Sequence, residues 1–416
     1  MTKRRWTILI AAILLGVGLL WLVLGRESIQ EGRCRLRLTQ NPDLDPITHL
    51  VSQTLSPLPD QPADIKDVPP EIRRPSHYYL TAGERQVPLA VDFSGNLKMC
   101  LDADADGMLS DERCYPAHLV KGLEERVTFR NKFGPLLMAI DHGEQQGSVR
   151  LTVLSYRRDK PGPLWVYPSH YRSGRLSLGG NVYAVALIDG DYDGLYKTLL
   201  SLPLDPSLQP RCDVFAIDLN GDGKFDEFGP GGEISPLTAM VAVDGRYYAA
   251  HVAHNGETLE LATVEPQEGH LAVDSPNTSL DLKLWSDAAN QVLSSRTNEW
   301  TLPVGRYQTV SAKLHLCDPN NDDWVFPMRP DFGIVRSFEI QPGCVTRLRA
   351  GPPFILTTNV EKGYANTLLI SPTLVGCTGE GYQFDFGRNG PRPSEREFKI
   401  VDEKGTVLET GKFEYG

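Results

Sequence analysis

Short apolar runs separated by turn residues fill the chain from about residue 78 onward, and they constrain its fold more than any other feature. Examples are Asn181–Ile188, Arg246–Val252 and Glu397–Val401, and 38 glycines and 31 prolines supply abundant turns. Such runs are typical of strands, and the Asp244-Gly245 pair is a favoured hairpin turn. Helical periodicity is confined to a short segment at Leu119–Val127. The sequence therefore predicts a mainly β chain built from several antiparallel β-sandwich and β-sheet modules.

The N-terminus carries a different signal, an uncharged apolar run at Trp6–Leu24 preceded by Lys3, Arg4 and Arg5. The run has 19 residues, and at ~1.5 Å per residue it reaches about 28 Å, enough to cross a bilayer core. The basic cluster predicts a cytoplasmic N-terminus. Residues 1–26 are therefore expected to form a transmembrane signal anchor, with a cleaved signal peptide as the alternative.

This topology places the remainder outside the cytoplasm, in the periplasm or on the cell surface. The net charge is −11; without the four basic residues of the N-terminal segment, 38 basic residues face 53 acidic ones. That charge argues against a nucleic-acid partner. Seven cysteines suit an oxidising compartment. Cys100 with Cys114 and Cys317 with Cys344 are candidate disulfides, with buried thiols as the alternative, and an odd count leaves at least one cysteine without an intrachain partner.

Eight prolines lie between residues 41 and 75 and exclude a long helix or a central strand there. Residues 27–77 are expected to form an extended stalk, part of which could instead drape over the first domain. We divide the rest into a calcium-loop β domain at 78–265, a β-sandwich at 266–350 and a C-terminal β domain at 351–416. The turn from Trp300 to Tyr307, with Pro303 and Gly305, resembles that of transthyretin-like (carboxypeptidase-regulatory-like) sandwiches, and the last domain has an immunoglobulin-like pattern.

Three loops combine oxygen-bearing side chains at positions 1, 3 and 5 with glycine at position 6, and a weaker fourth begins at Asp318. Such spacing lets oxygens converge on one point, while glycine permits the sharp turn. Calcium takes six to eight oxygen ligands, including the backbone carbonyl at position 7 and often a group at position 9. The candidate ligands of the first loop are Asp102, Asp104, Asp106, Met108 and Ser110; of the second, Asp189, Asp191, Asp193 and Leu195; and of the third, Asp218, Asn220, Asp222, Lys224 and Asp226.

These loops resemble the EF-hand calcium loop and its relatives in dockerins and other extracytoplasmic calcium-loop β-proteins of unassigned function. The resemblance implies bound calcium. An EF-hand has a glutamate at position 12, whereas these loops have Arg113, Leu200 and Gly229. Strand-like runs precede the second and third loops where an EF-hand has a helix, so strand–loop–turn units are expected. Asp111, Glu112, Glu227 or Glu233 could complete the coordination. The second loop has Lys197 at position 9, which cannot ligate, so this loop could bind weakly or share ligands with the third.

The sequence thus predicts a membrane-anchored, calcium-binding structural or binding protein of the cell envelope. The first alternative is a calcium-dependent module that binds an envelope glycan or protein. For this alternative, Trp165, Tyr167, Tyr171 and Tyr192 would share one open face. The second alternative is an envelope hydrolase with structural calcium, although the chain lacks Gly-x-Ser-x-Gly, His-Glu-x-x-His and phosphate-loop motifs, and no catalytic residue is assigned.

Overall fold

The computed structural model confirms a mainly β chain with several antiparallel sheets and no α-helix in the residues that it describes. Those residues are 30–40, 51–94, 97–104, 106–119, 131–141, 146–155, 160–203, 211–226, 232–274, 277–294, 297–329, 333, 335–362, 368–383, 387–388, 397–401 and 404–412. The expected signal anchor and nearly all of the Leu119–Val127 segment lie outside them. Within the described ranges, no helix has the length and apolar character needed to span a membrane.

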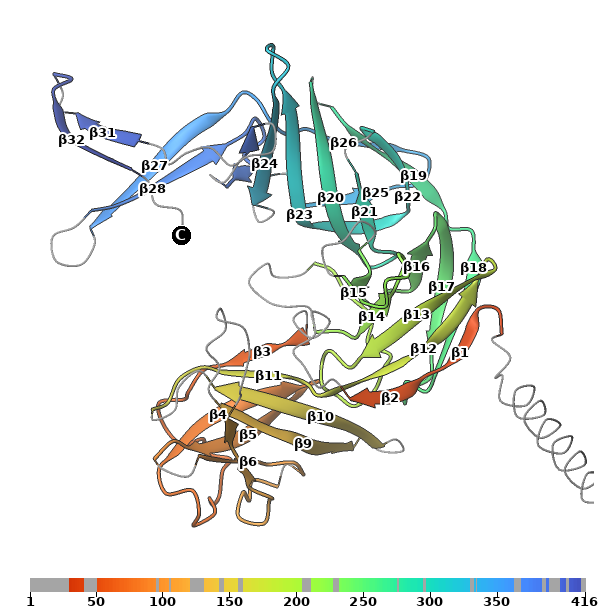
Figure 1. Ribbon diagram of the computed structural model, residues 1–416, viewed down its shortest axis with the longest axis vertical. Coiled ribbons are helices and arrows are strands. Elements are labelled where there is room, and N and C mark those ends of the chain that lie inside the picture. Colours follow the sequence, from red (N-terminus) through yellow and green to blue (C-terminus); the bar gives the residue numbers. More distant parts are fainter. Residues whose placement is uncertain are drawn as a thin grey trace, which may run out of the picture.

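The first core lies between two sheets at one end of the molecule (Figure 1), and together they form the first sandwich. Tyr78, Phe133 and Leu151 are among its fully buried side chains. One sheet has the order β3(Gln53–Leu55), β11(Leu164–Pro168), β10(Gln146–Ser155), β9(Asn131–Asp141), β8(His118–Leu119). The other has the order β4(Pro75–Ala82), β5(Arg85–Asp92), β6(Lys98–Leu101), β7(Tyr115–Pro116).

The second core lies in the middle of the molecule, again between two sheets (Figure 1), and together they form the second sandwich. The first of these has the order β1(Arg33–Arg35), β18(Thr258–Val264), β17(Arg246–Val252), β16(Met240–Val243). The second has the order β15(Ile234–Pro236), β14(Val214–Ile217), β13(Asn181–Ile188), β12(His170–Leu178), β2(Arg37–Gln40). The residues expected to form one calcium-loop domain therefore line two cores.

The expectation of an extended stalk is wrong in part, because residues 33–35, 37–40 and 53–55 are strands of the sheets. Strands β1, β2 and β3 pair with β18, β12 and β11, respectively, and each is an edge strand. Val51 and Leu55 are buried. The segment is draped over the two sandwiches at these places, because its strands add backbone hydrogen bonds and apolar burial that an extended stalk would forgo.

The third core lies between a three-stranded and a nine-stranded sheet. The smaller sheet has the order β22(Glu299–Pro303), β19(Glu268–Val273), β26(Val345–Leu348). The larger has the order β21(Gln291–Leu293), β20(Thr278–Ser286), β23(Gly305–Cys317), β24(Asp323–Arg329), β29(Gly381–Tyr382), β28(Leu368–Val375), β27(Ile355–Lys362), with β25(Ser337–Ile340) on β23 and β30(Gly387–Arg388) on β24. Strands β31(Glu397–Val401) and β32(Val407–Lys412) form a separate pair. The residue 351 boundary is not reflected in packing, since Tyr382 is buried in this core.

Strands β13 and β14 position the central site because their sheet is buried on both faces. Val185 and Leu187 point into the second core, whereas Ala186 and Ile188 pack with Val51 on the opposite face. Burial on both sides explains a continuous apolar run in place of strict alternation. The antiparallel register pairs Ile188 with Val214, so the chain leaves β13 beside the point where it enters β14.

Candidate metal centre

The three predicted loops share one set of backbone hydrogen bonds. In each, the position-1 carboxylate accepts from the glycine amide at position 6, at 3.1 Å for Asp102, 2.8 Å for Asp189 and 3.0 Å for Asp218. The position-5 carboxylate accepts from the amide at position 7, at 2.7, 2.7 and 2.8 Å, respectively. The position-6 glycines, Gly107, Gly194 and Gly223, all have positive φ angles, of 83°, 78° and 82°. The sequence pattern therefore corresponds to a single recurring loop conformation.

A further acidic residue closes each loop by accepting the amide of position 2. Glu112 accepts from Ala103 at 2.7 Å, and Glu233 accepts from Leu219 at 2.9 Å. At the second loop this role belongs to Asp213, which accepts from Gly190 at 3.2 Å and from Thr198 at 2.8 Å. Glu112 and Glu233 were among the acids expected near the loops, whereas Asp213 was missed. The available signal was its place directly before β14, opposite Asp189 in the hairpin register.

Carboxylates at two of the loops lie close enough together to hold one metal ion. One oxygen each from Asp102, Asp104 and Asp106 lie within 4.8 Å of one another, and the same holds for Asp189, Asp191 and Asp213. Two oxygens bound to one calcium ion at ~2.3–2.6 Å are at most about 5 Å apart. Both groups fit that limit. Asp193, the position-5 residue of the second loop, lies outside its group.

The two acidic groups differ in burial. At the first loop Asp102 is buried, but Asp104 and Asp106 are exposed. At the second loop Asp189, Asp191 and Asp213 have exposed fractions of 2%, 8% and 0%. Burial is the main reason why the pKa values of Asp189 and Asp213 lie well above the usual range, and the neighbouring aspartates raise them further. The second loop thus holds concentrated acidity in a desolvated place.

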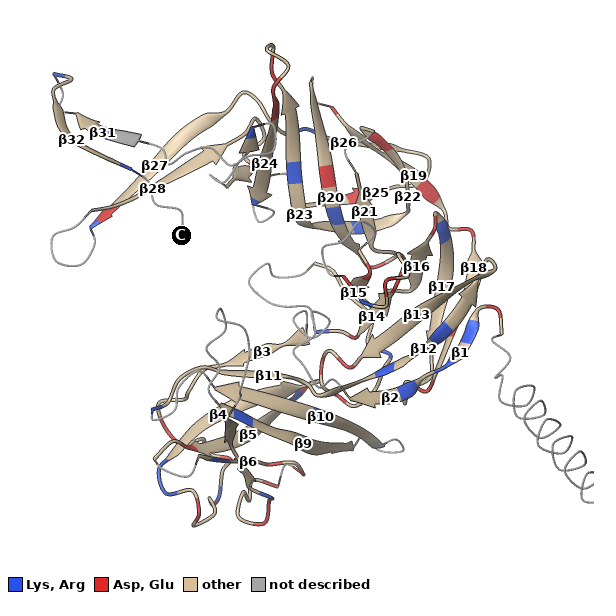
Figure 2. Ribbon diagram, viewed as in Figure 1, with Lys and Arg blue, Asp and Glu red and all other residues tan. Residues whose placement is uncertain are grey.

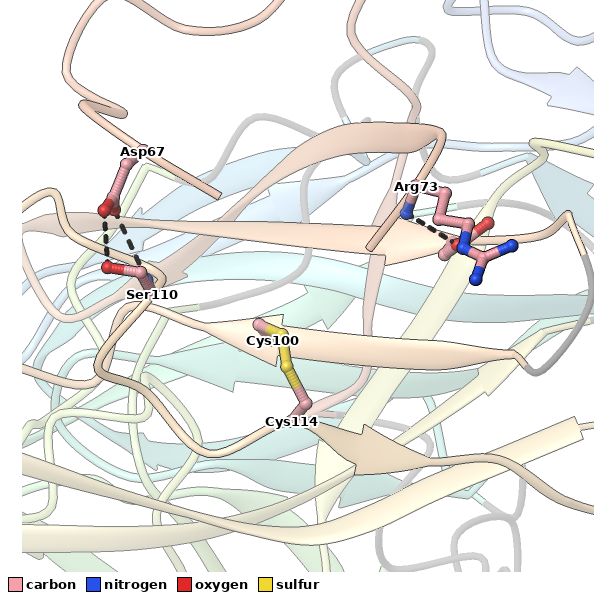
Figure 3. The surroundings of a disulfide bond; sticks show 6 residues. Asp67, Arg73, Cys100, Ser110 and Cys114 are labelled. Atoms are coloured by element: carbon pink, nitrogen blue, oxygen red, sulfur yellow. Dashed lines mark hydrogen bonds between the residues drawn. A yellow bond between two sulfur atoms is a disulfide. The ribbon is translucent and has the colours of Figure 1, made fainter. Parts of the chain in front are cut away.

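A disulfide and hydrogen bonds from residues outside the first loop restrain it (Figure 3). Cys100 and Cys114 form the predicted disulfide, and the Ser110 hydroxyl donates to Asp67. The Lys66 amide donates to the Gly107 carbonyl at 2.8 Å. Ser110, expected to contribute at position 9, is thus hydrogen-bonded to the segment before β4. Cys317 and Cys344 are not joined, and both are exposed thiols.

The third loop is the most open of the three. Asp218 is buried at the end of β14, whereas Asn220, Asp222 and Lys224 are exposed. Its acidic side chains form no group of three among the described residues, because Asn220 occupies position 3. The second and third loops lie at opposite ends of β14, with the Asp218 amide donating to the Ala184 carbonyl. The expectation that they share ligands is therefore wrong, since their aspartates belong to opposite ends of one strand.

The weaker fourth loop is held by hydrogen bonds to Asp318 and by an ion pair with an arginine. The Asp318 carboxylate accepts from the Asn320 and Asp322 amides at 2.8 and 3.0 Å and from the Trp324 indole at 3.2 Å. Arg388 forms an ion pair with Asp322. Acidic residues, red in Figure 2, also occur in other connections between strands. The common loop conformation, rather than acidity alone, distinguishes the first three loops.

The four aromatic residues considered for glycan binding do not form one open face. Tyr192 and Tyr167 are 0% and 3% exposed, and Trp165 and Tyr171 are half-buried. No protein-family model matches the chain, and neither a curated protein nor a solved structure is significantly similar to it. The functional argument therefore rests on the loops themselves.

Proposed function

We propose that this chain is a membrane-anchored, extracytoplasmic calcium-binding protein whose ions stiffen the loops of a structural or binding component of the cell envelope. The observation that carries this proposal is the convergence of three carboxylates within 4.8 Å at two loops of the same conformation. Calcium suits these sites because the converging groups are all oxygens, with no histidine or thiolate among them. The disulfide at the first loop supports an oxidising compartment.

A structural role follows from the energetics. Extracellular calcium modules bind the ion at about 10⁻⁴–10⁻³ M. At a tenfold excess over the dissociation constant, each filled site stabilises the folded state by about 1.4 kcal/mol. Filling a site also removes the mutual repulsion of clustered carboxylates, as at Asp102, Asp104 and Asp106. Calcium at ambient extracellular levels would keep such loops filled rather than switch them.

Calorimetric calcium titration and thermal melting of the full-length protein test this function. We expect calcium to bind and to raise the melting temperature by a few degrees per site relative to chelator. Asp104→Asn should weaken the site at the first loop, whereas Glu361→Gln, on an exposed strand outside the loops, should bind like the wild type. Absence of bound calcium together with identical melting in chelator would exclude the proposal.

A calcium-dependent binding module is a second candidate, favoured by a cavity of about 490 Å³ beside the third loop. Its wall includes Asn220 and Glu233 from that loop region and Tyr247, Lys283 and Asn290 from the neighbouring strands and turn. Mixed polar and aromatic walls suit a small polar ligand such as a saccharide. Titration with soluble mono- and disaccharides, in calcium and in chelator, tests this candidate; equal melting temperatures with and without sugar would count against it.

A further inference from the structure

The second loop belongs to two cores at once. It leaves β13 of the second sandwich, but the Tyr192 ring is fully buried in the first core, among residues that include Leu151 and Val166. The Tyr192 hydroxyl donates to the carbonyls of Val51 and Val166. The residue adopts a φ of 63°, a left-handed conformation that is unfavourable for an aromatic side chain. A short segment at 189–195 therefore links the two sandwiches through one inserted ring.

Two elements of the first sandwich also rest directly on this loop. The amide of Gly83, in the β4–β5 turn, donates to the Asp191 carbonyl at 2.6 Å. Gly147 of β10 approaches so closely that a Cβ there would lie 2.7 Å from the Asp193 carbonyl oxygen. The position of the second loop and the docking of the first sandwich are thus coupled.

The carboxylates beneath this contact lack sufficient partners of their own. Asp189 Oδ1 and Asp191 Oδ1 are buried without a hydrogen-bond partner. Within the described part of the chain, no ion pair with a lysine or arginine is formed by Asp189, Asp191 or Asp213. Buried charges without a counter-ion are strongly destabilising. The two unpartnered oxygens therefore indicate a cationic ligand.

A cavity of about 130 Å³ reaches Asp189 of this group, with Gly194 and Tyr196 also in its wall, whereas Asp191 and Asp213 do not line it. It has room for water, which commonly completes the coordination of calcium. Arg172 also lines the cavity, but its guanidinium lies over the Tyr196 ring and 4.0 Å from Glu257. Its Nε atom is buried without a hydrogen-bond partner, but in the described part of the chain Arg172 forms no ion pair with the three aspartates.

We propose that Asp213 joins Asp189 and Asp191 as a ligand of a buried divalent cation, and that this cation fastens the first sandwich to the second. The inference rests on the proposed calcium function and adds a ligand outside the loop motif together with a mechanical role. Three carboxylates in close contact repel one another when unfilled. The cation holds them together, keeps residues 189–195 compact and thereby keeps Tyr192 and the Asp191 carbonyl in place against the first sandwich.

Calcium binding and amide hydrogen exchange of full-length Asp213→Asn test the proposal. The substitution retains the shape of the side chain but removes its charge and one of the two oxygens that accept from Gly190 and Thr198. We expect the variant to bind one calcium fewer than the wild type in saturating calcium and the Gly83 amide to exchange at least tenfold faster. The matched variants Asp222→Asn and Asp104→Asn, at the other two loops, should each weaken a different site and leave Gly83 exchange unchanged.

The outcomes separate the two proposals. If wild-type protein binds no calcium, the proposed function fails and this inference fails with it. If calcium binds but Asp213→Asn retains the same stoichiometry and affinity, Asp213 is not a ligand. If a calcium is lost without faster exchange at Gly83, the cation does not fasten the sandwiches. Should Asp213→Asn fail to fold, Asp191→Asn and the wild type in calcium and chelator provide the same two readings.

Discussion

The second and third loops have the same local conformation but different surroundings. Both carry the same position-1 and position-5 hydrogen bonds and a glycine of nearly equal φ. At position 3, Asp191 is 8% exposed and its carbonyl accepts from Gly83 of the first sandwich, whereas Asn220 of the third loop is exposed. The motif therefore fixes how the chain curls, while the neighbours decide whether a bound ion would stiffen a surface loop or hold two domains together.

The first loop shows a third arrangement, in which covalent and backbone contacts support an exposed acidic group. The Cys100–Cys114 disulfide and the Lys66 amide restrain it from two sides. The second loop is restrained by the packing of Tyr192, and the third chiefly by the buried carboxylate of Glu233. These differences predict that similar changes will have unequal effects.

The largest effect is expected from Tyr192→Ala, which would remove the ring that links the second loop to the first core. Truncation of a buried aromatic side chain costs about 3–5 kcal/mol. Urea unfolding should show this loss, whereas Tyr192→Phe should cost about 1–3 kcal/mol because two carbonyls lose their donor. A loss below about 1 kcal/mol for Tyr192→Ala would contradict the linking role.

The next effect is expected from removal of the disulfide at the first loop. Cys100 and Cys114 are separated by 14 residues, and closing a loop of that size stabilises a fold by about 3 kcal/mol. The Cys100→Ser/Cys114→Ser double variant should lose this amount in non-reducing urea unfolding. The control is Cys317→Ser/Cys344→Ser, whose exposed free thiols predict a change within about 0.5 kcal/mol. Equal losses of stability in the two double variants would contradict a stabilising role of the Cys100–Cys114 disulfide.

The smallest effect is the difference in stability between alanine variants of the position-6 glycines in the second and third loops. A Cβ at Gly194 would lie 2.5 Å from the Ser148 amide nitrogen, whereas a Cβ at Gly223 would meet nothing within 4 Å. Both alanine variants bear the cost of positive φ, about 1–2 kcal/mol, but Gly194→Ala adds a backbone clash. We expect Gly194→Ala to be about 2 kcal/mol less stable than Gly223→Ala, measured by urea unfolding in chelator. Similar stabilities of the two variants would mean that the contact between the second loop and β10 can open with little loss of stability.

Much of the local structure is predictable from sequence because it depends on neighbouring residues. The strands at Asn181–Ile188, Arg246–Val252 and Glu397–Val401 occur with the expected bounds. Asp244 and Gly245 have the positive φ angles of the predicted hairpin turn. The Cys100–Cys114 disulfide also follows from proximity along the chain.

Features that depend on contacts between residues far apart in the sequence are harder to predict. Residues 27–77 are expected to form a stalk because the prolines between 41 and 75 exclude central strands, yet β1–β3 are edge strands of sheets formed by much later residues. Proximity in sequence suggested that Asp189 and Asp218 share an ion, whereas β14 separates them. Asp213 has no place in the loop motif because it lies 20 residues after Asp193, outside any loop spacing.

The β class, the curl of the three acidic loops and the candidate oxygen ligands can be derived from the sequence, because they depend on residues a few positions apart. The packing of distant segments places Asp213 beside Asp189 and Asp191, and it buries Tyr192 in a different core from the strand that precedes it. Burial and counter-charge are collective properties of packed chains. No motif spacing encodes them, so one sequence pattern yields an exposed loop at Asp222 and a buried junction at Asp191.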